Sequence, residues 1–332
     1  MSATRIGLQI PNFTYPDTNV GDLFDRVSAI AQTGERAGFD TIFVMDHFFQ
    51  LPLIGAPERE MFDAYTLLGA LAARTETARL ATLVTGVTYR NPALLAKAVT
   101  ALDVISKGRA MLGIGAAWFE LEHQSLDVRF PPVKERFERL EDALRICRAM
   151  FTQEQSTVVG THHSITDAWN SPRPVQPGGP PIMVGGQGEK KTLRLAAQYA
   201  DELNTNPSFV DIPHKLDVLA KHLADVGRDR SSIAVSCLGT IVIAPTHDAA
   251  EAKLAQMLRE RGVAEPSTVL DDPAARAAVL PRMLAGDPDE VAEQAQALIA
   301  TGLDGIVVNM IADGHDLETV ELAGQTLAKA LA

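Results

Sequence analysis

The sequence has few cysteines, few aromatic residues and no long hydrophobic run, and each shortage excludes a class of protein. Its two cysteines, Cys147 and Cys237, have no second cysteine nearby, which excludes a disulfide scaffold, a zinc knuckle and a redox pair. No apolar run reaches the roughly 18 residues that a membrane-spanning helix needs, and the first residues lack the pattern of a signal peptide. We therefore expect a soluble cytoplasmic protein with no membrane partner.

The chain also has fewer basic residues than acidic ones. The chain has 30 Lys and Arg against 42 Asp and Glu, a net charge of -12. Nucleic acids and anionic membranes are bound through clustered Lys and Arg, so we expect neither as a partner. The hydrophobic content of 46% over 332 residues excludes a disordered chain. After these exclusions, we expect a folded protein that acts on a small molecule.

Short β-branched runs alternate with longer segments of helical period, which indicates βαβ units around a parallel sheet. The runs cover residues 5–10, 41–45, 80–87, 109–114, 181–184, 202–204, 233–243 and 305–310. Eight such runs predict an α/β fold, a (β/α)8 TIM barrel that forms one domain over residues 1–332. An open doubly wound sheet is the alternative, although nothing divides the chain into two halves.

Two segments interrupt this alternation, and two of the connections from a helix to the next strand have similar sequences. We predict a polar hairpin insertion at 155–170 and an extra helical segment at 246–286. After it, Asp287 is expected to cap a helix whose first residue is Pro288. Gly38 and Gly302 occur in similar sequences before two of the strands, where glycine can adopt the left-handed conformation that ends a helix.

Polar residues directly after the strands are the candidates for function, because barrel active sites form at the carboxyl ends of the strands. Asp46 and His47 follow the second strand, and an aspartate can orient a histidine that titrates near neutral pH. In isolation the pair is better explained as a loop pair that caps the next helix. Its position at a strand end favours a catalytic role.

A glycine-rich turn, Gly185 to Gly188, separates the fifth strand from a helix expected to begin near Glu189. Free backbone N–H groups and a helix dipole would make this turn an anion site, most naturally for a phosphate. A tight turn without a ligand is the alternative. We expect no metal, because the His, Cys, Asp and Glu residues lack the spacings of a zinc site.

Taken together, these segments resemble the luciferase-like monooxygenase superfamily, and within it the coenzyme F420-dependent oxidoreductases. The resemblance spans nearly the whole chain and rests on IGLQIP (6–11), VMDHF (44–48), TGVTYRNP (85–92), LDVISKGR (102–109), GIGAAW (113–118), VGGQGEKKTLR (184–194) and ADELN (200–204). It implies a homodimer of barrels, each with a flavin-like ring lying across the strand ends. A cis peptide bond that is not before proline is implied at Gly86-Val87, behind the ring.

The resemblance also assigns roles to residues. Asp46 and His47 would be catalytic, with His47 donating, accepting or orienting a proton. The cofactor would be bound by Asp46, Thr85, Gly86, Val87, Thr88, Asn91, Gly115, Ala116, Gly185, Gly186, Gln187 and Gly188. A substrate pocket would be lined by Phe13, Phe48, Phe49 and Trp118.

The implied activity is hydride transfer between F420 and a small, partly apolar organic substrate. An FMN-dependent luciferase-like monooxygenase or reductase is one alternative, and a non-catalytic flavin- or deazaflavin-binding protein is another. Ala116 occupies the position where the family's sugar-phosphate dehydrogenases have a catalytic glutamate, which puts a glucose 6-phosphate dehydrogenase in doubt. The sequence leaves open whether Glu120 or Glu122 replaces that carboxylate.

Overall fold

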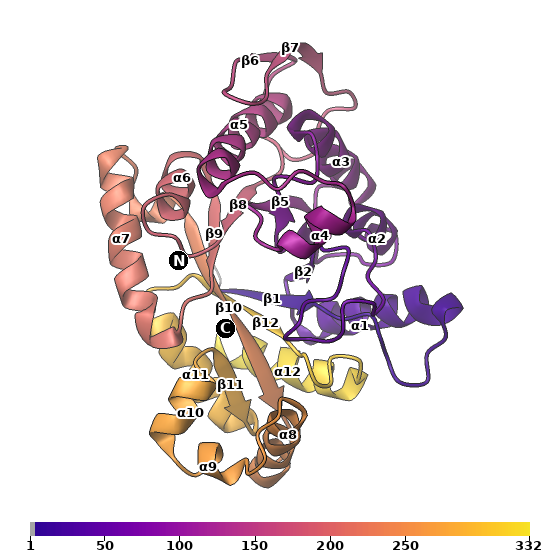
Figure 1. The fold of residues 1–332 in the computed structure, drawn as a ribbon, viewed down its shortest axis with the longest axis vertical. Helices are drawn as coiled ribbons and strands as arrows, with labels where there is room; N and C mark the ends of the chain where they lie inside the picture. Colours follow the sequence, from indigo (N-terminus) through magenta and orange to yellow (C-terminus); the bar gives the residue numbers. More distant parts are fainter. Residues whose placement is uncertain (1–3) are drawn as a thin grey trace.

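A closed ring of eight parallel strands forms the centre of the computed structural model, which describes residues 4–332 (Figure 1). The ring runs β1, β2, β3, β5, β8, β9, β10, β12, and it closes because β12 pairs with β1. The ring strands are β1 (Arg5–Ile10), β2 (Thr41–Val44), β3 (Arg79–Thr82), β5 (Ala110–Gly115), β8 (Ile182–Gly185), β9 (Glu202–Thr205), β10 (Ala234–Ile243) and β12 (Gly305–Asn309). The predicted (β/α)8 barrel is confirmed.

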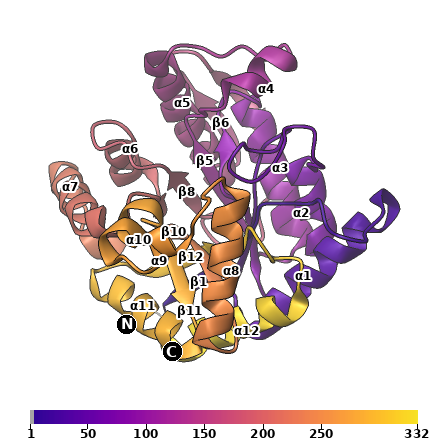
Figure 2. The ribbon, with the colours of Figure 1, turned by 60° about the horizontal axis from the view of Figure 1, so that its bottom comes forward.

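Helices surround the ring on its outer side, as Figures 1 and 2 show from two directions. Those that follow the ring strands are α1 (Leu23–Ala37), α2 (Ala64–Ala72), α3 (Pro92–Ile105), α4 (Glu120–Ser125), α5 (Val133–Thr152), α6 (Thr192–Tyr199), α7 (Ile212–Asp225), α11 (Pro288–Ala300) and α12 (Leu317–Ala330). In the described part of the chain, none of the helices combines the length and the apolar character that crossing a bilayer requires.

The core has two layers. Phe43, Met111, Met183 and Val307 pack together inside the barrel, and a larger apolar cluster fills the space between the strands and the helices. Strands that are buried on both faces are expected to be continuously apolar, and the burial of all six residues of β5 fits this rule. Inside the barrel, a Cβ at Gly113 would collide with the carbonyl oxygen of Thr82, so this close approach of β3 and β5 requires glycine.

The corners predicted from the sequence are confirmed. Gly38 ends α1 with φ of 109°, and Gly302 follows α11 with φ of 104°, both in the left-handed region. At the start of α11 the Asp287 side chain accepts from the N–H of Glu290, and the Glu290 side chain accepts from the N–H of Asp287. Pro288 is the first residue of the helix.

Two additions extend the barrel. The antiparallel pair β6 (Gln155–Val158) and β7 (Ile165–Trp169) follows α5, and the buried carboxylate of Asp142 on α5 accepts from the N–H groups of residues 161–163 in its turn. The second addition lies between β10 and α11. It contains α8 (His247–Glu260), α9 (Ser267–Leu270), α10 (Pro273–Val279) and β11 (Met283–Gly286).

β11 corrects the expectation of a wholly helical segment over 246–286. It pairs with the last four residues of β10, Thr240–Ile243, of which Thr240 also pairs with Asn309 of the ring strand β12. The sequence of β11 is Met-Leu-Ala-Gly, which has no β-branched residue and is only four residues long. Its strand conformation therefore comes from pairing and from burial against α8, not from local propensity.

The third barrel strand is interrupted where the sequence predicted one run over 80–87. β3 ends at Thr82, and a two-residue strand, β4 (Thr85–Gly86), then pairs with β5. The cis peptide bond lies in the interruption, between Leu83 and Val84, and not at Gly86-Val87 as the resemblance implied. Thr85 and Gly86 pair with β5, so the bulge lies before them, at Leu83 and Val84 between β3 and β4.

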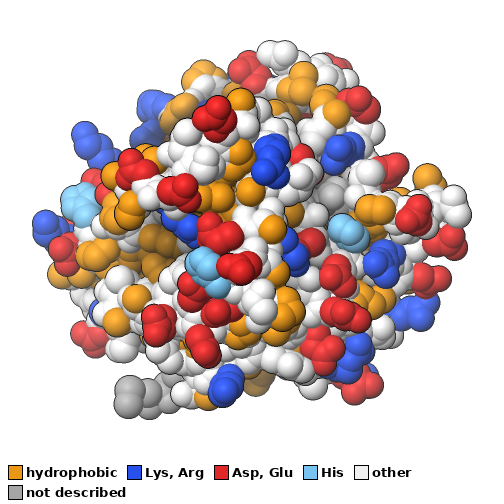
Figure 3. Space-filling view, turned by 90° about the horizontal axis from the view of Figure 1, so that it is seen from below, with side chains coloured by type: hydrophobic (Ala, Val, Ile, Leu, Met, Phe, Trp, Pro, Cys, Tyr) orange, Lys and Arg blue, Asp and Glu red, His pale blue; other side chains and the backbone are white. Residues whose placement is uncertain are grey.

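The surface carries both signs of charge. On the face drawn in Figure 3, acidic and basic side chains are interspersed with hydrophobic ones, and the basic residues form no continuous field there. This pattern agrees with the excess of acidic residues in the sequence.

Candidate active site

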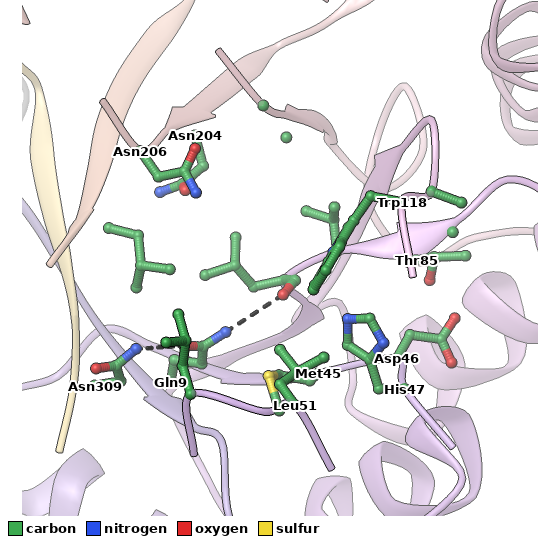
Figure 4. Close-up of a pocket in the computed structure, with 18 of the residues that line it drawn as sticks. Gln9, Met45, Asp46, His47, Leu51, Thr85, Trp118, Asn204, Asn206 and Asn309 are labelled. Atoms are coloured by element: carbon green, nitrogen blue, oxygen red, sulfur yellow. Dashed lines mark hydrogen bonds between the residues drawn. The ribbon is translucent and has the colours of Figure 1, made fainter. Parts of the chain in front are cut away.

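A cavity of about 490 Å³ opens at the carboxyl ends of the barrel strands. This volume is in the range of about 300–1,000 Å³ that is usual for small-molecule sites. His47 and Trp118 lie at one end, and Asn204 and Asn206 lie at the other (Figure 4). The cavity is therefore long enough to present different chemistry at its two ends.

Gln9 connects three strands across the cavity wall. Its amide oxygen accepts from Asn309 at 2.9 Å, and its amide nitrogen donates to the carbonyl oxygen of Leu83 at 3.3 Å (Figure 4). Both partners sit at strand ends, Asn309 on β12 and Leu83 just after β3. The amide of Gln9 thereby ties the bulge after β3 to the first and last strands of the ring.

His47 is held by a buried carboxylate. Its Nδ1 lies 3.0 Å from Oε2 of Glu122, which is on α4, and the Glu122 side chain has no exposed surface. The hydroxyl of Tyr89 donates to the same oxygen, and the N–H groups of Phe48 and Phe49 donate to Oε1, the latter at 2.9 Å. Burial opposes ionisation of Glu122, but the hydrogen bonds from His47, Tyr89 and Phe49 outweigh it and lower the pKa of this carboxyl.

Asp46 is buried beside an arginine. Arg90 forms an ion pair with Oδ2, while Oδ1 of Asp46 is buried and has no hydrogen-bond partner among the described residues. Burial raises the pKa of Asp46, and the guanidinium of Arg90 opposes this rise. Thr85, which hydrogen-bonds to Tyr65 at 2.8 Å, lines the same end of the cavity.

The glycine turn at 185–188 differs from its expected form in one respect. The helix that follows it begins at Thr192, because residues 189–191 form a turn, so the helix start near Glu189 was predicted three residues too early. Gly186 has φ of 133° and donates its N–H to the carbonyl oxygen of Asn204 at 3.0 Å. That N–H is therefore already used within the fold.

Two of the basic residues near this turn have partners elsewhere. The ammonium of Lys191 lies 5.2 Å from the ring centroid of Phe137, and Arg194 donates to Gln198 at 3.0 Å. An anion at the turn would therefore depend on backbone N–H groups and on Lys190, the next basic residue along the chain. A Cβ at Gly185 would lie 2.6 Å from Cγ1 of Val84, so glycine is also needed there for packing against the bulge.

The cavity wall includes nine of the residues that the sequence singled out. These are Asp46, His47, Thr85, Gly86, Ala116, Trp118, Gly185, Gly186 and Gln187. The ring of Trp118 meets that of His47 edge to face, with centroids 5.9 Å apart. Four separate strand ends thus supply residues to one cavity.

The other predicted residues lie outside the wall. Phe13 is in the core against Phe62, and Phe48 packs edge to face on Tyr89. The remaining residues outside the wall are Phe49, Val87, Thr88, Asn91, Gly115 and Gly188. Among them, Thr88 hydrogen-bonds to His123 and Asn91 caps the start of α3, which gives each a structural contact.

Several wall residues were not predicted from the sequence. Leu51, Pro52, Leu53 and Ile54, in the loop after His47, add an apolar side. Arg282 adds a cation, and it donates to the carbonyl oxygen of Asn206 at 3.0 Å. Arg282 precedes β11 and follows no strand, so a search for polar residues at the carboxyl ends of strands could not have found it.

In this barrel, Asp46 and His47 lie in a cavity at the carboxyl ends of the strands. This arrangement is typical of barrel proteins that carry out chemistry on small molecules. Residues 4–305 match the luciferase-like monooxygenase family, so the chain belongs to that family. An F420-dependent glucose-6-phosphate dehydrogenase of Microbacterium testaceum is 29% identical over 300 residues, which cover 86% of each protein.

Solved structures agree on the fold. The coenzyme F420-dependent tetrahydromethanopterin reductase of Methanopyrus kandleri aligns with a TM-score of 0.80 and 18% identity over 100% of both chains. The monooxygenase RslO1 of Streptomyces bottropensis aligns with a TM-score of 0.80 and 21% identity over 98% of both chains. A reductase and a monooxygenase align equally well, so the barrel alone does not distinguish their chemistries.

Proposed function

We propose that this protein is an F420-dependent oxidoreductase that transfers a hydride between the deazaflavin and a small, partly apolar organic substrate. The observation that carries the proposal is His47, which lines the cavity while its Nδ1 is held by Glu122. A histidine in this position can exchange a proton with a substrate as the hydride moves. The similarity to a dehydrogenase named as F420-dependent supports the choice of cofactor.

The residues present fit such a cofactor on two counts. The buried Oδ1 of Asp46 has no partner among the described residues and can accept a hydrogen bond from the edge of a bound ring. The turn at 185–188 has little side-chain bulk, so a phosphate could approach its backbone closely. When bound, F420 would supply the site for hydride, because its ring has carbon where flavins have the reactive nitrogen.

The protein's own residues would bind, orient and handle protons. The apolar residues at 51–54 and Trp118 line one side of the cavity and would shield a ligand held against them from water. A substrate held between them and the ring would place a polar group near His47, which would take up or release one proton per turnover. Holding the reactants in contact supplies much of the rate in such reactions.

We do not favour glucose 6-phosphate as the substrate. Ala116 supplies no carboxylate, and Glu122, which could have replaced it, is occupied by His47, Tyr89 and two backbone N–H groups. Arg282 is a cation in the cavity wall, so the far end can still accept an anionic or strongly polar group.

The deciding experiment is a titration of the purified protein with F420 and, separately, with FMN, followed by absorbance and fluorescence. We expect tight binding of F420 and weak binding of FMN. Tight binding of FMN alone, with oxygen uptake after reduction, would overturn the proposal in favour of a flavin monooxygenase. Binding of F420 that no substrate can oxidise or reduce, with His47→Asn identical to wild type, would instead indicate a non-catalytic binding protein.

A homodimer in the cytoplasm remains part of the proposal. The outer face of α3 supports the dimer, because Leu94 and Ile105 are 69% and 52% exposed and Ala101 lies between them at helical spacing. A helix with apolar residues on its outer face is typical of a surface that another subunit covers.

A further inference from the structure

Glu122 is surrounded by hydrogen-bond donors. Two backbone N–H groups donate to Oε1, and the Tyr89 hydroxyl and Nδ1 of His47 contact Oε2. An ionised carboxylate can only accept hydrogen bonds. Nδ1 of His47 must therefore carry a hydrogen, whether the imidazole is neutral or protonated.

This constraint determines the tautomer of His47. With hydrogen on Nδ1, the neutral ring has its lone pair on Nε2. Trp118 and Phe119 each contact the ring edge to face, with centroids 5.9 Å away, and they also pack on each other at 5.2 Å, so this aromatic pair packs against the imidazole. We propose that Glu122 is a positioning residue that keeps His47 in the Nδ1–H tautomer, so that Nε2 is the proton acceptor of the site.

The substrate class follows, and this step rests on the proposed function. A free lone pair on Nε2 suits a substrate with a hydroxyl group. With F420 bound, the carbinol carbon of such a substrate would give its hydride, with both electrons, to the cofactor, and Nε2 of His47 would accept the O–H proton. The substrate would become a carbonyl compound and the cofactor would be reduced, and in the reverse direction Nε2 would return the proton to the carbonyl oxygen.

The sharpest test is Glu122→Gln. The N–H groups of Phe48 and Phe49 need an oxygen, so the new amide nitrogen would face His47 and Tyr89. An amide nitrogen donates, so Nδ1 of His47 would become the acceptor and Nε2 would carry the hydrogen. In a serine protease, the equivalent exchange of the carboxylate that orients the histidine lowers kcat about 10⁴-fold by selecting the wrong tautomer.

Two measurements follow from this reversal. Nitrogen NMR of ¹⁵N-histidine-labelled protein, with the His47 signals assigned by their loss in His47→Asn, reports the tautomer directly. We expect Nδ1–H in the wild type and Nε2–H in Glu122→Gln. In single-turnover assays with an alcohol substrate, we expect hydride transfer to fall at least 100-fold, with the dissociation constant of F420 changed less than threefold.

Asp142→Asn is the matched control. Asp142 is also a buried carboxylate that accepts from backbone N–H groups, but its contacts are in the turn between β6 and β7. This variant should leave the His47 tautomer and the hydride-transfer rate unchanged. Tyr89→Phe removes one hydrogen-bond donor from Glu122 but leaves the carboxylate as the acceptor for His47. This variant should therefore keep His47 in the Nδ1–H tautomer.

The outcomes separate this inference from the proposed function. A wild-type His47 with hydrogen on Nε2 would overturn the positioning role, whatever the activity. An Nδ1–H tautomer that reverses in Glu122→Gln, in a protein that does not bind F420, would support the positioning role and refute the proposed cofactor. Equal loss of activity in Glu122→Gln and Asp142→Asn, with no change of tautomer, would reduce Glu122 to a structural residue.

Discussion

Arg90 forms an ion pair with the buried carboxylate of Asp46, next to the end of the cavity that contains His47. The second terminal nitrogen of Arg90 lies 2.8 Å from Asp63, which caps α2, and the guanidinium lies 4.8 Å from the ring centroid of Tyr65. The arginine therefore connects a helix start to the candidate site. Because Asp46 is far more buried than Asp63, it depends more on this cation.

Arg90→Met should destabilise the protein by about 3–5 kcal/mol, because it leaves a buried carboxylate without its cation. It should also raise the pKa of Asp46 further, since burial raises that pKa and Arg90 opposes the rise. An acid with a raised pKa in the folded state makes the fold less stable as pH increases. The loss, measured by urea unfolding, should therefore be larger at pH 8 than at pH 5.

Arg74→Met is the control for this experiment. Arg74 also pairs with an aspartate, Asp25, at 3.6 Å, but both side chains are more than half exposed. Its loss should cost at most about 1 kcal/mol. Equal losses for the two arginine variants, or no dependence on pH for Arg90→Met, would contradict the role assigned to Arg90.

Trp118 should report ligand binding by its fluorescence, because it lines the cavity and its ring contacts that of His47. The chain has two tryptophans, and Trp169 lies on the β6–β7 hairpin, outside the cavity wall. We expect F420 to quench the emission of the wild type and of Trp169→Phe, and to have little effect on Trp118→Phe. Strong quenching that survives in Trp118→Phe would place the ligand elsewhere.

Gly188→Leu should weaken F420 binding at least tenfold, about 1.4 kcal/mol, if the turn at 185–188 holds a phosphate. Gly188 is chosen over Gly186, because φ of 133° at Gly186 would strain any other residue. A Cβ at Gly188 would lie 3.0 Å from Oγ1 of Thr192, which lines the cavity, so Tm is measured together with affinity. The exposed Gly21 has open space around it, so Gly21→Leu is the control. Unchanged affinity in Gly188→Leu, with an unchanged Tm, would refute the phosphate site.

The double variant Leu94→Glu/Ile105→Glu should be a monomer, because it places charges on the exposed apolar face of α3. Sedimentation equilibrium should give twice the chain mass of 35.7 kDa for the wild type and a single chain mass for the variant. Val20→Glu/Val210→Glu, at two exposed apolar positions on other parts of the chain, should stay dimeric. A monomeric wild type would exclude the dimer.

Much of the fold could be predicted because local patterns and tertiary structure agree. Buried parallel strands are continuously apolar, and the glycines at 38 and 302 end their helices as their sequences suggest. β11 could not be predicted in the same way, since its four residues have no strand preference of their own. The position of the cis peptide bond depended on pairing between β4 and β5, which is not encoded locally.

Residues of the candidate site that directly follow strands could be predicted from the sequence. Those on helices and in loops could not. Asp46 and His47 directly follow β2, so strand position alone identified them. The sequence named Glu122 only together with Glu120, and hydrophobicity could not choose between them, because it predicts the reverse of what α4 does: Leu121 is 43% exposed and Glu122 is fully buried. Phe13 follows a strand as well, but an aromatic side chain gains as much from the core as from a pocket, and its ring packs on Phe62.

β10 pairs with the ring strands β9 and β12 through residues 234–240, and it pairs with β11 through Thr240–Ile243. The segment that begins after β10 and ends with β11 therefore forms an appendage, whose helices have their own apolar cluster. Arg282 lies in this appendage, whereas His47 and Glu122 lie in the first half of the chain. Replacing or resizing residues 244–286 would therefore change the Arg282 end of the cavity while leaving His47 and Glu122 in place.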